Sequence, residues 1–165
     1  MSESRVIARN PVDLLSHEHL LLESLLDAYQ ELDSRQVQQK KELFRRIEHE
    51  VSDHIRTEEL LLYPTLMKLE DALARELVAR ALEAHRRIEC VLADLRGPGS
   101  EPTLDGRGMA LLRNYTRWHM EFERKEIYPL ASRLPHVTLN QLGLELEMRL
   151  FKEGTAQGDD GLETS

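Results

Sequence analysis

Apolar residues recur along most of this chain at intervals of three and four, the spacing that forms one face of an α-helix. Four long stretches carry such a stripe, and a shorter fifth one follows them. We therefore expect an all-α fold. The expected helices cover, in order, Pro11 through Tyr29, about 35 to the late sixties, about 72–96, about 107–128 and about 139–151.

The expected helix ends carry signals of their own. Asn10 can cap the first helix, and Pro11 suits its first turn. Ser34 is a candidate cap for the second helix. Pro64 should kink that helix, because proline removes one backbone hydrogen bond. The third helix should end at the Gly97-Pro98-Gly99 run, which opens the main loop of the chain.

Both ends of the chain lack this periodicity. Residues 1–10 are predicted to be a flexible arm, and residues 153–165 a disordered tail rich in Gly, Asp, Thr and Ser. Residues 11–152 then form one domain, which is large enough to bury a core without disulfides. The fifth helix carries a stripe of Leu142, Leu146 and Leu150, and we expect it to cap the bundle or a partner.

One motif occurs twice in the chain. His54, Glu58 and the pair Tyr63-Pro64 recur 65 residues later as His119, Glu123 and Tyr128-Pro129. Four residues along a helix bring two side chains to within about 40° of each other, so each His and Glu share a face. A single His-x-x-x-Glu is common by chance, but two copies with matched Tyr-Pro endings indicate paired metal ligands.

The repeat includes two further histidines. His19 lies 35 residues before His54, and His85 lies 34 before His119. The chain is therefore interpreted as two helical hairpins of equal arm length, packed as an antiparallel bundle with four imidazoles at one depth. His17 remains an alternative to His19, although the leucine stripe favours His19. The surface histidines are expected to be His49 and His136.

These residues predict a metal site of a particular kind. Imidazole and carboxylate without thiolate suit iron, manganese or zinc. Four histidines with Glu58 and Glu123 give too many ligands for one tetrahedral zinc ion, so a site with two metal ions fits the number of ligands better. If both carboxylates bridge, positions stay open for an exogenous ligand.

The choice of carboxylates is less clear from spacing alone, because every one of the four histidines has Glu at the fourth position after it. Glu23 and Glu89 follow apolar residues that turn them toward the edge of the stripe. Phe122 competes with Glu123 in the same way. The Tyr-Pro endings favour Glu58 and Glu123 as the ligands.

Composition removes several other classes of protein. The formal charge of −8 argues against a nucleic-acid or acidic-lipid surface. The single cysteine, Cys90, excludes an intrachain disulfide and a cysteine-based zinc site. No apolar run reaches the length of a membrane span, and the first ten residues are too polar for a signal peptide. A cytoplasmic protein is expected.

The motifs resemble haemerythrin-like domains of the HHE cation-binding family over about residues 11–151. The matching segments are Glu18-His19, His54 through Pro64, Ala84-His85 and His119 through Pro129. The resemblance implies an up-down four-helix bundle with an oxo- or hydroxo-bridged di-iron centre. Its metal ligands would be His19, His54, Glu58, His85, His119 and Glu123, with both glutamates bridging.

The chain departs from the invertebrate oxygen carriers of that family. It has Glu89 and Arg124 where they have a histidine and an aspartate, which puts reversible oxygen carriage in doubt. The expected function is binding or sensing of O₂ or NO, or storage of iron. A di-iron enzyme acting on peroxide, NO or O₂ is the second hypothesis, and a metal-free interaction module the third. The redox partner is left open.

Overall fold

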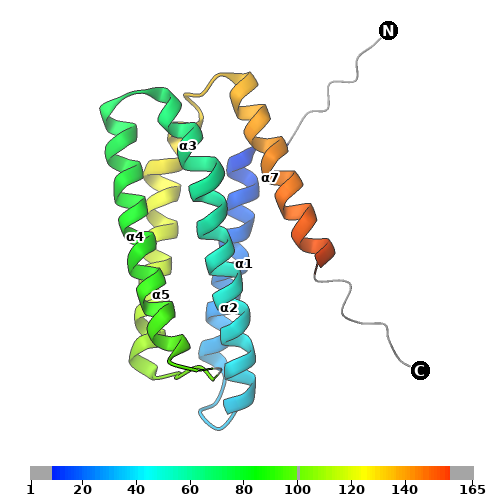
Figure 1. Ribbon diagram of the computed structural model, residues 1–165, viewed down its shortest axis with the longest axis vertical. Helices are drawn as coiled ribbons and strands as arrows, with labels where there is room; N and C mark the ends of the chain where they lie inside the picture. Colours follow the sequence, from blue (N-terminus) through cyan, green and yellow to red (C-terminus); the bar gives the residue numbers. More distant parts are fainter. Residues whose placement is uncertain (1–8, 100, 157–165) are drawn as a thin grey trace, which may run out of the picture.

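Four long helices lie side by side in the computed structural model, which describes residues 9–99 and 101–156, with side chains through residue 152 (Figure 1). Successive long helices are connected at alternate ends of the molecule (Figure 1). They are α1 (Pro11–Glu31), α2 (Val37–Thr57), α4 (Ala72–Arg96) and α5 (Gly106–Phe122). No described residue belongs to a strand. The expected all-helical fold is confirmed.

The helix ends agree with the sequence at most positions. The Asn10 side chain accepts a hydrogen bond from the Val12 N–H at 2.9 Å, as predicted for a cap. Gly97 ends α4 with a φ of 67°, which favours glycine. Ser34 is not the cap of α2, since the helix begins three residues later. The side chain of Asp33 instead accepts from the Arg35 N–H at 2.9 Å and holds this segment in a turn.

Both copies of the repeated motif contain a π-helical turn. These turns, η1 (Glu58–Leu62) and η3 (Glu123–Ile127), continue α2 and α5 into the short helices α3 (Tyr63–Leu66) and α6 (Tyr128–Ala131). Each begins at the glutamate of the motif, and the N–H of the tyrosine five residues later bonds to its carbonyl. The irregularity expected at Pro64 therefore lies just before it, where the wider turn accommodates a residue that lacks an N–H.

The core is divided into two apolar clusters. One lies near the α2–α4 and α5–α7 connections and includes Leu15, Leu62, Ala81 and Phe122. The other lies toward the opposite end and includes Leu22, Val51, Ile88 and Leu112. The buried histidines lie where the two clusters meet: on α1 His19 falls between Leu15 and Leu22, and on α4 His85 falls between Ala81 and Ile88. A polar layer therefore separates the two halves of the core.

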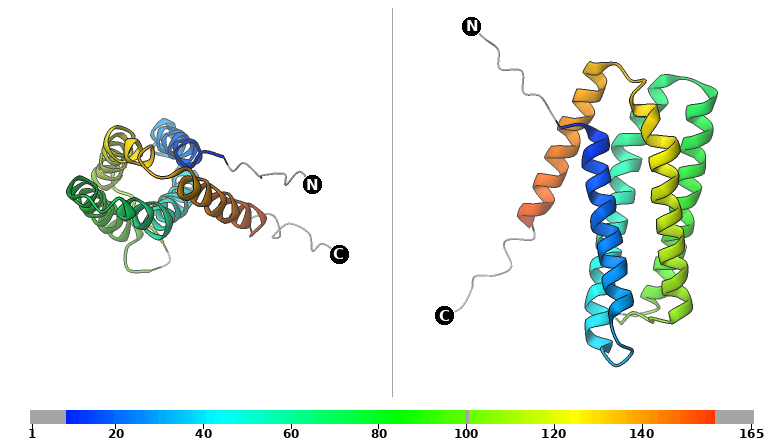
Figure 2. Two further views of the ribbon diagram at one scale, coloured as in Figure 1. Left: turned by 90° about the horizontal axis from the view of Figure 1, so that it is seen from above. Right: turned by 180° about the vertical axis from the view of Figure 1, so that it is seen from behind.

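The last helix, α7 (His136–Ala156), lies outside the four-helix group. It packs beside α1 and η1 and leans away from the bundle toward its C-terminal end (Figure 2). It extends beyond the expected 139–151 at both ends. Leu142 and Leu146 are buried against the bundle, as the stripe predicted.

The terminal predictions fall largely outside the described residues. Residues 1–8 of the expected arm and residues 157–165 of the expected tail are not described. The described part of the arm contacts α7, because the Arg9 N–H donates to Glu147 at 2.9 Å.

A 3₁₀ turn, η2 (Met67–Leu69), leads into the connection before α4. None of the described helices combines the length and apolar composition needed to cross a membrane.

Candidate metal centre

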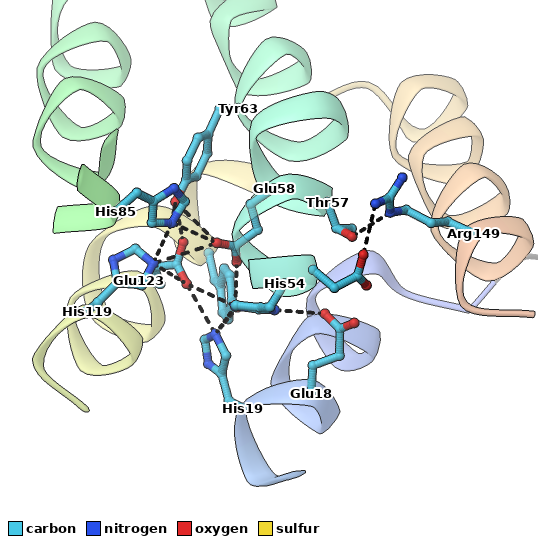
Figure 3. A network of polar contacts seen from close by, with 12 residues as sticks. Glu18, His19, His54, Thr57, Glu58, Tyr63, His85, His119, Glu123 and Arg149 are labelled. Carbon is cyan, nitrogen blue, oxygen red and sulfur yellow. Dashed lines mark hydrogen bonds and ion pairs between the residues drawn. The ribbon is translucent and has the colours of Figure 1, made fainter. Parts of the chain in front are cut away.

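The six predicted ligands meet in the polar layer between the two apolar clusters (Figure 3). Each long helix contributes one histidine, and each π-helical turn contributes its first residue, a glutamate. All six side chains are buried, and both glutamates are fully inaccessible to solvent. The members of this layer are His19, His54, Glu58, His85, His119 and Glu123.

The imidazoles approach one another in pairs through their Nε2 atoms. His19 Nε2 lies 3.0 Å from His54 Nε2, and His85 Nε2 lies 2.9 Å from His119 Nε2. Within each pair the rings meet nearly edge to face, at 70° and 69°. Each pair joins the two helices of one hairpin, so the ring nitrogens of a hairpin converge on one point. Convergent imidazole nitrogens are the arrangement that a metal ion binds.

The two carboxylates connect the hairpins. Glu58 lies 3.1 Å from His54 Nε2 of its own hairpin and 3.3 Å from His85 Nε2 of the other. Glu123 lies 3.4 Å from His119 Nε2 and 3.1 Å from His19 Nε2. Each glutamate therefore faces one histidine pair on each side.

Two overlapping sets of donors follow from this arrangement. One contains His19, His54, Glu58 and Glu123, and the other contains His85, His119, Glu58 and Glu123. Within each set the donor atoms lie within 4.8 Å of one another. Nitrogen and carboxylate oxygen donors that are buried and aimed at common points fit metal ions. The chain thus has a buried histidine–glutamate cluster that can hold metal, with both glutamates in both sets.

The electrostatics of the layer depend on these contacts. Burial opposes the charged form of His54, but the carboxylates of Glu58, Glu123 and Glu18 raise its pKa well above the usual value. Burial likewise opposes ionisation of Glu58, yet the surrounding imidazoles hold the pKa of that carboxyl well below its usual range. The carboxylates are therefore ionised, which is the form that binds a cation.

Two further glutamates orient two of the histidines. Both belong to the sequence motifs but had no predicted role there. Glu18 lies 2.9 Å from His54 Nδ1, and Glu59 lies 2.9 Å from His85 Nδ1. A carboxylate on Nδ1 fixes the tautomer that leaves Nε2 free for a metal. Each of these glutamates is adjacent in the chain to one of the six predicted residues, Glu18 to His19 and Glu59 to Glu58. That adjacency is the signal by which the sequence could have identified them.

The tyrosines of the motif also reach the layer. Tyr63 donates its hydroxyl to Glu123 at 2.6 Å, and the Tyr128 hydroxyl lies 2.9 Å from His19 Nε2. Burial, followed by the nearby glutamates, raises the pKa of both tyrosines well above 10. Both phenols therefore keep their protons. The matched tyrosine position in the two copies was the sequence signal for this contact.

The alternative ligands lie elsewhere. His17, His49 and His136 are exposed, Glu89 is exposed, and Glu23 is half-buried at the edge of its stripe. Neither donor set contains any of these five residues.

Phe122, which competed with Glu123 for the inward position, is buried beside it. The ring of Trp118 stacks on Phe122 at 5.4 Å. Both neighbouring side chains are therefore buried, Phe122 in the apolar core and Glu123 in the polar layer.

Comparison with known proteins gives two findings. The family model described as "Hemerythrin HHE cation binding domain" matches residues 10–131. A crystal structure of a hemerythrin HHE cation binding domain-containing protein from Mycobacterium kansasii is similar in fold, with a TM-score of 0.71 and 24% sequence identity. The alignment covers 93% of this chain and 95% of that one. No curated protein matches the chain.

Proposed function

Because the chain belongs to the hemerythrin HHE cation-binding family, we propose that its histidine–glutamate layer holds two iron ions and that the protein binds O₂ or NO there. The observation that carries the proposal is the presence of Glu58 and Glu123 in both donor sets. Two separate mononuclear sites would not need to share both carboxylates. The proposed fold around the site is an up-down antiparallel four-helix bundle.

The proposed ligands are the six residues of the layer, two histidines to each metal with both glutamates bridging. Iron, with an oxo or hydroxo bridge, would supply a redox-active centre that takes up diatomic molecules. The donor set favours iron, manganese or zinc over soft-metal alternatives. Six protein side chains do not fill two octahedral coordination shells, so positions remain for a small ligand.

The surrounding residues would control what reaches this ligand. The apolar clusters on both sides exclude water and ions from the layer. Tyr63 and Tyr128 keep hydroxyl protons inside it, the first donated to Glu123. A small neutral ligand held there meets hydrogen-bond donors and no bulk solvent. This environment suits binding or sensing of a diatomic molecule.

The same hydroxyls favour a second candidate function, a di-iron enzyme acting on peroxide, NO or O₂. Breaking such substrates consumes protons, and two phenols that remain protonated at neutral pH lie in contact with the proposed ligands. The two candidates differ in turnover. A binding protein takes up its ligand once per centre, whereas an enzyme consumes substrate continuously when supplied with reductant.

Metal analysis and anaerobic spectroscopy test the proposal. We expect two iron ions per chain, and an absorption spectrum that changes when the dithionite-reduced protein meets O₂ or NO. Steady consumption of peroxide or NO would select the enzyme. A protein that folds with no bound metal and shows no such response would instead support a metal-free interaction module.

A further inference from the structure

An open groove lies on the outer surface of the α4–α5 pair, the two helices that carry His85 and His119. Its volume is about 760 Å³, within the range of sites for small organic molecules. We call it the α4–α5 groove. Its walls include Ala79, Arg80, Ala84, Arg87, Tyr115 and Trp118.

The walls of the groove include residues that are adjacent in the chain to residues of the metal layer. Ala84 directly precedes His85, and Trp118 directly precedes His119. Trp118 is 53% exposed. Its ring stacks on the buried ring of Phe122, with 5.4 Å between centroids and 5° between planes. Phe122 in turn precedes Glu123, so the two stacked rings are held by the same segment of chain as the proposed ligands His119 and Glu123.

The groove offers charges of both signs. The guanidinium carbon of Arg80 lies 4.7 Å from the Phe122 ring centroid, and no ion pair of Arg80 occurs within the described part of the chain. Arg87, by contrast, is paired with Glu83 at 3.6 Å. Glu76, also on the wall, has no cation partner among the described residues. Among the described residues, the apolar and aromatic floor therefore has at its edge a guanidinium and a carboxylate that form no ion pair.

We propose that the α4–α5 groove binds a reduced flavin, which passes electrons to the metal layer through Trp118 and Phe122. The tricyclic ring of a flavin stacks on an exposed tryptophan, as nucleobases do on aromatic side chains. Its N–H groups can donate to Glu76, and the phosphate of a flavin nucleotide can pair with Arg80. The proposal rests on the proposed function, since it requires a redox-active metal.

The chemistry of the electron carrier supports a flavin over a nicotinamide. An iron ion accepts one electron at a time, and a flavin releases its electrons singly, whereas a nicotinamide transfers a hydride. A reduced flavin that gives up two electrons and releases two protons to solvent becomes the oxidised flavin. Those two electrons convert two ferric ions to two ferrous ions, so one flavin reduces one complete centre.

Binding is tested by fluorescence, because Trp118 is the only tryptophan in the chain. Oxidised flavin mononucleotide should quench its emission saturably, with or without metal in the protein. Trp118→Leu should weaken binding at least about tenfold, measured from the flavin's own fluorescence, as loss of an aromatic stack predicts. Arg80→Gln should weaken binding of the mononucleotide and leave riboflavin, which has no phosphate, unaffected. Val137→Ala, a change at an 82% exposed apolar residue of α7, is the matched control.

Reduction kinetics separate this inference from the proposed function. Reduced flavin mononucleotide should reduce the ferric protein anaerobically, at least about tenfold more slowly in Trp118→Leu, while NADH alone should not. Dithionite should reduce both proteins alike. Unsaturable quenching, or equal flavin rates in both proteins, would overturn the inference even if dithionite reduction shows an intact iron centre. A protein without redox-active metal would refute the proposed function, and with it the electron transfer.

Discussion

Glu58 lies between His54 of its own hairpin and His85 of the other, and Glu123 lies in the equivalent position between His119 and His19. A carboxylate in this position contributes to both donor sets at once. Its removal should therefore affect both proposed metal ions, whereas removal of a histidine affects mainly one. This difference separates bridging from terminal ligands by experiment.

We expect Glu58→Ala and Glu123→Ala to reduce metal content from two ions per chain to one or none. Each change removes a donor from both sets. Glu23→Ala and Glu89→Ala are matched controls, because both residues also lie four positions after a histidine, and they should keep two ions. Elemental analysis of the purified variants provides the measurement. Two ions retained by Glu123→Ala but lost by Glu89→Ala would reverse the assignment.

A second expectation concerns Glu18 and Glu59, which contact the Nδ1 atoms of His54 and His85. Replacing either by Ala should lower metal affinity about 10–100-fold, because the imidazole loses the partner that orients it. Competition with a chromophoric chelator measures the affinity. Glu18 is the more buried of the two, with 17% of its side chain exposed against 41% for Glu59, so its replacement should have the larger effect. Unchanged affinity in both variants would show that these contacts are incidental.

The sequence predicted which six side chains the structure brings together, but not the contacts around them. His19, His54, His85 and His119 were identifiable because the repeat and the leucine stripes both place them inward. The pairing of Glu18 with His54 joins residues 36 positions apart, and it depends on how α1 and α2 are rotated against each other. No spacing along one helix contains that information.

At the scale of elements, the two π-helical turns explain the spacing of the motif. The first step, four residues from His to Glu, fits an α-helical turn. The second step, five residues from Glu to Tyr, would place the tyrosine about 140° away from the glutamate in a regular α-helix. In η1 and η3 the backbone bond from Tyr to Glu closes a turn over that interval and brings the tyrosine back to the layer. Such turns are rare and often lie at functional sites.

The same turns mark the limit of sequence prediction for the elements. Helix positions follow from apolar spacing, so α1, α2, α4 and α5 were predicted within a few residues at most ends. A π turn breaks the period of 3.6 without a distinctive composition, and only Pro64, which follows the first of them, predicted an irregularity. The longer α7 was underestimated because its ends have weak apolar spacing.

Helix α7 is attached to the site through Arg149. Its guanidinium donates to the buried Thr57 hydroxyl at 2.6 Å and to Asp53 at 3.1 Å, next to Glu58 and His54 in the chain (Figure 3). Arg149→Met should lower the free energy of unfolding by about 1.5–3 kcal/mol, the usual contribution of a hydrogen bond to a charged group.

Urea denaturation measures the stability of that variant, and hydrogen exchange should show faster exchange in α7. Arg149→Lys, which keeps the charge but not the fork of donors, should give an intermediate value. Equal stability of the Met variant and the original protein would mean that apolar packing alone holds α7 in place.

For the molecule as a whole, each hairpin supplies two histidines and one glutamate to one donor set. The same glutamate also belongs to the other donor set. Without metal, two ionised carboxylates and four imidazoles must share a buried layer between two apolar clusters, which is costly. Metal that binds only the folded state stabilises it by mass action. The fold and the proposed site should therefore depend on each other.

Removal of metal should lower the melting temperature. A free metal concentration a thousandfold above the dissociation constant contributes about 4 kcal/mol, which corresponds to roughly 8–16 °C for a chain of this size. Thermal melting followed by circular dichroism, before and after dialysis against a chelator, measures the shift. An apo protein that melts as high as the metal-loaded form would show that the layer is not coupled to the fold.

The two apolar clusters that enclose the layer also set how metal would leave it. A chelator is large and charged, so it cannot cross packed leucine side chains to reach the layer while the helices stay together. Release must wait until thermal motion separates the hairpins. At low chelator concentration the rate of loss should rise with concentration, and at high concentration it should become constant. That plateau is the rate at which the bundle opens, so the rate of metal loss measures the opening motion of the protein itself.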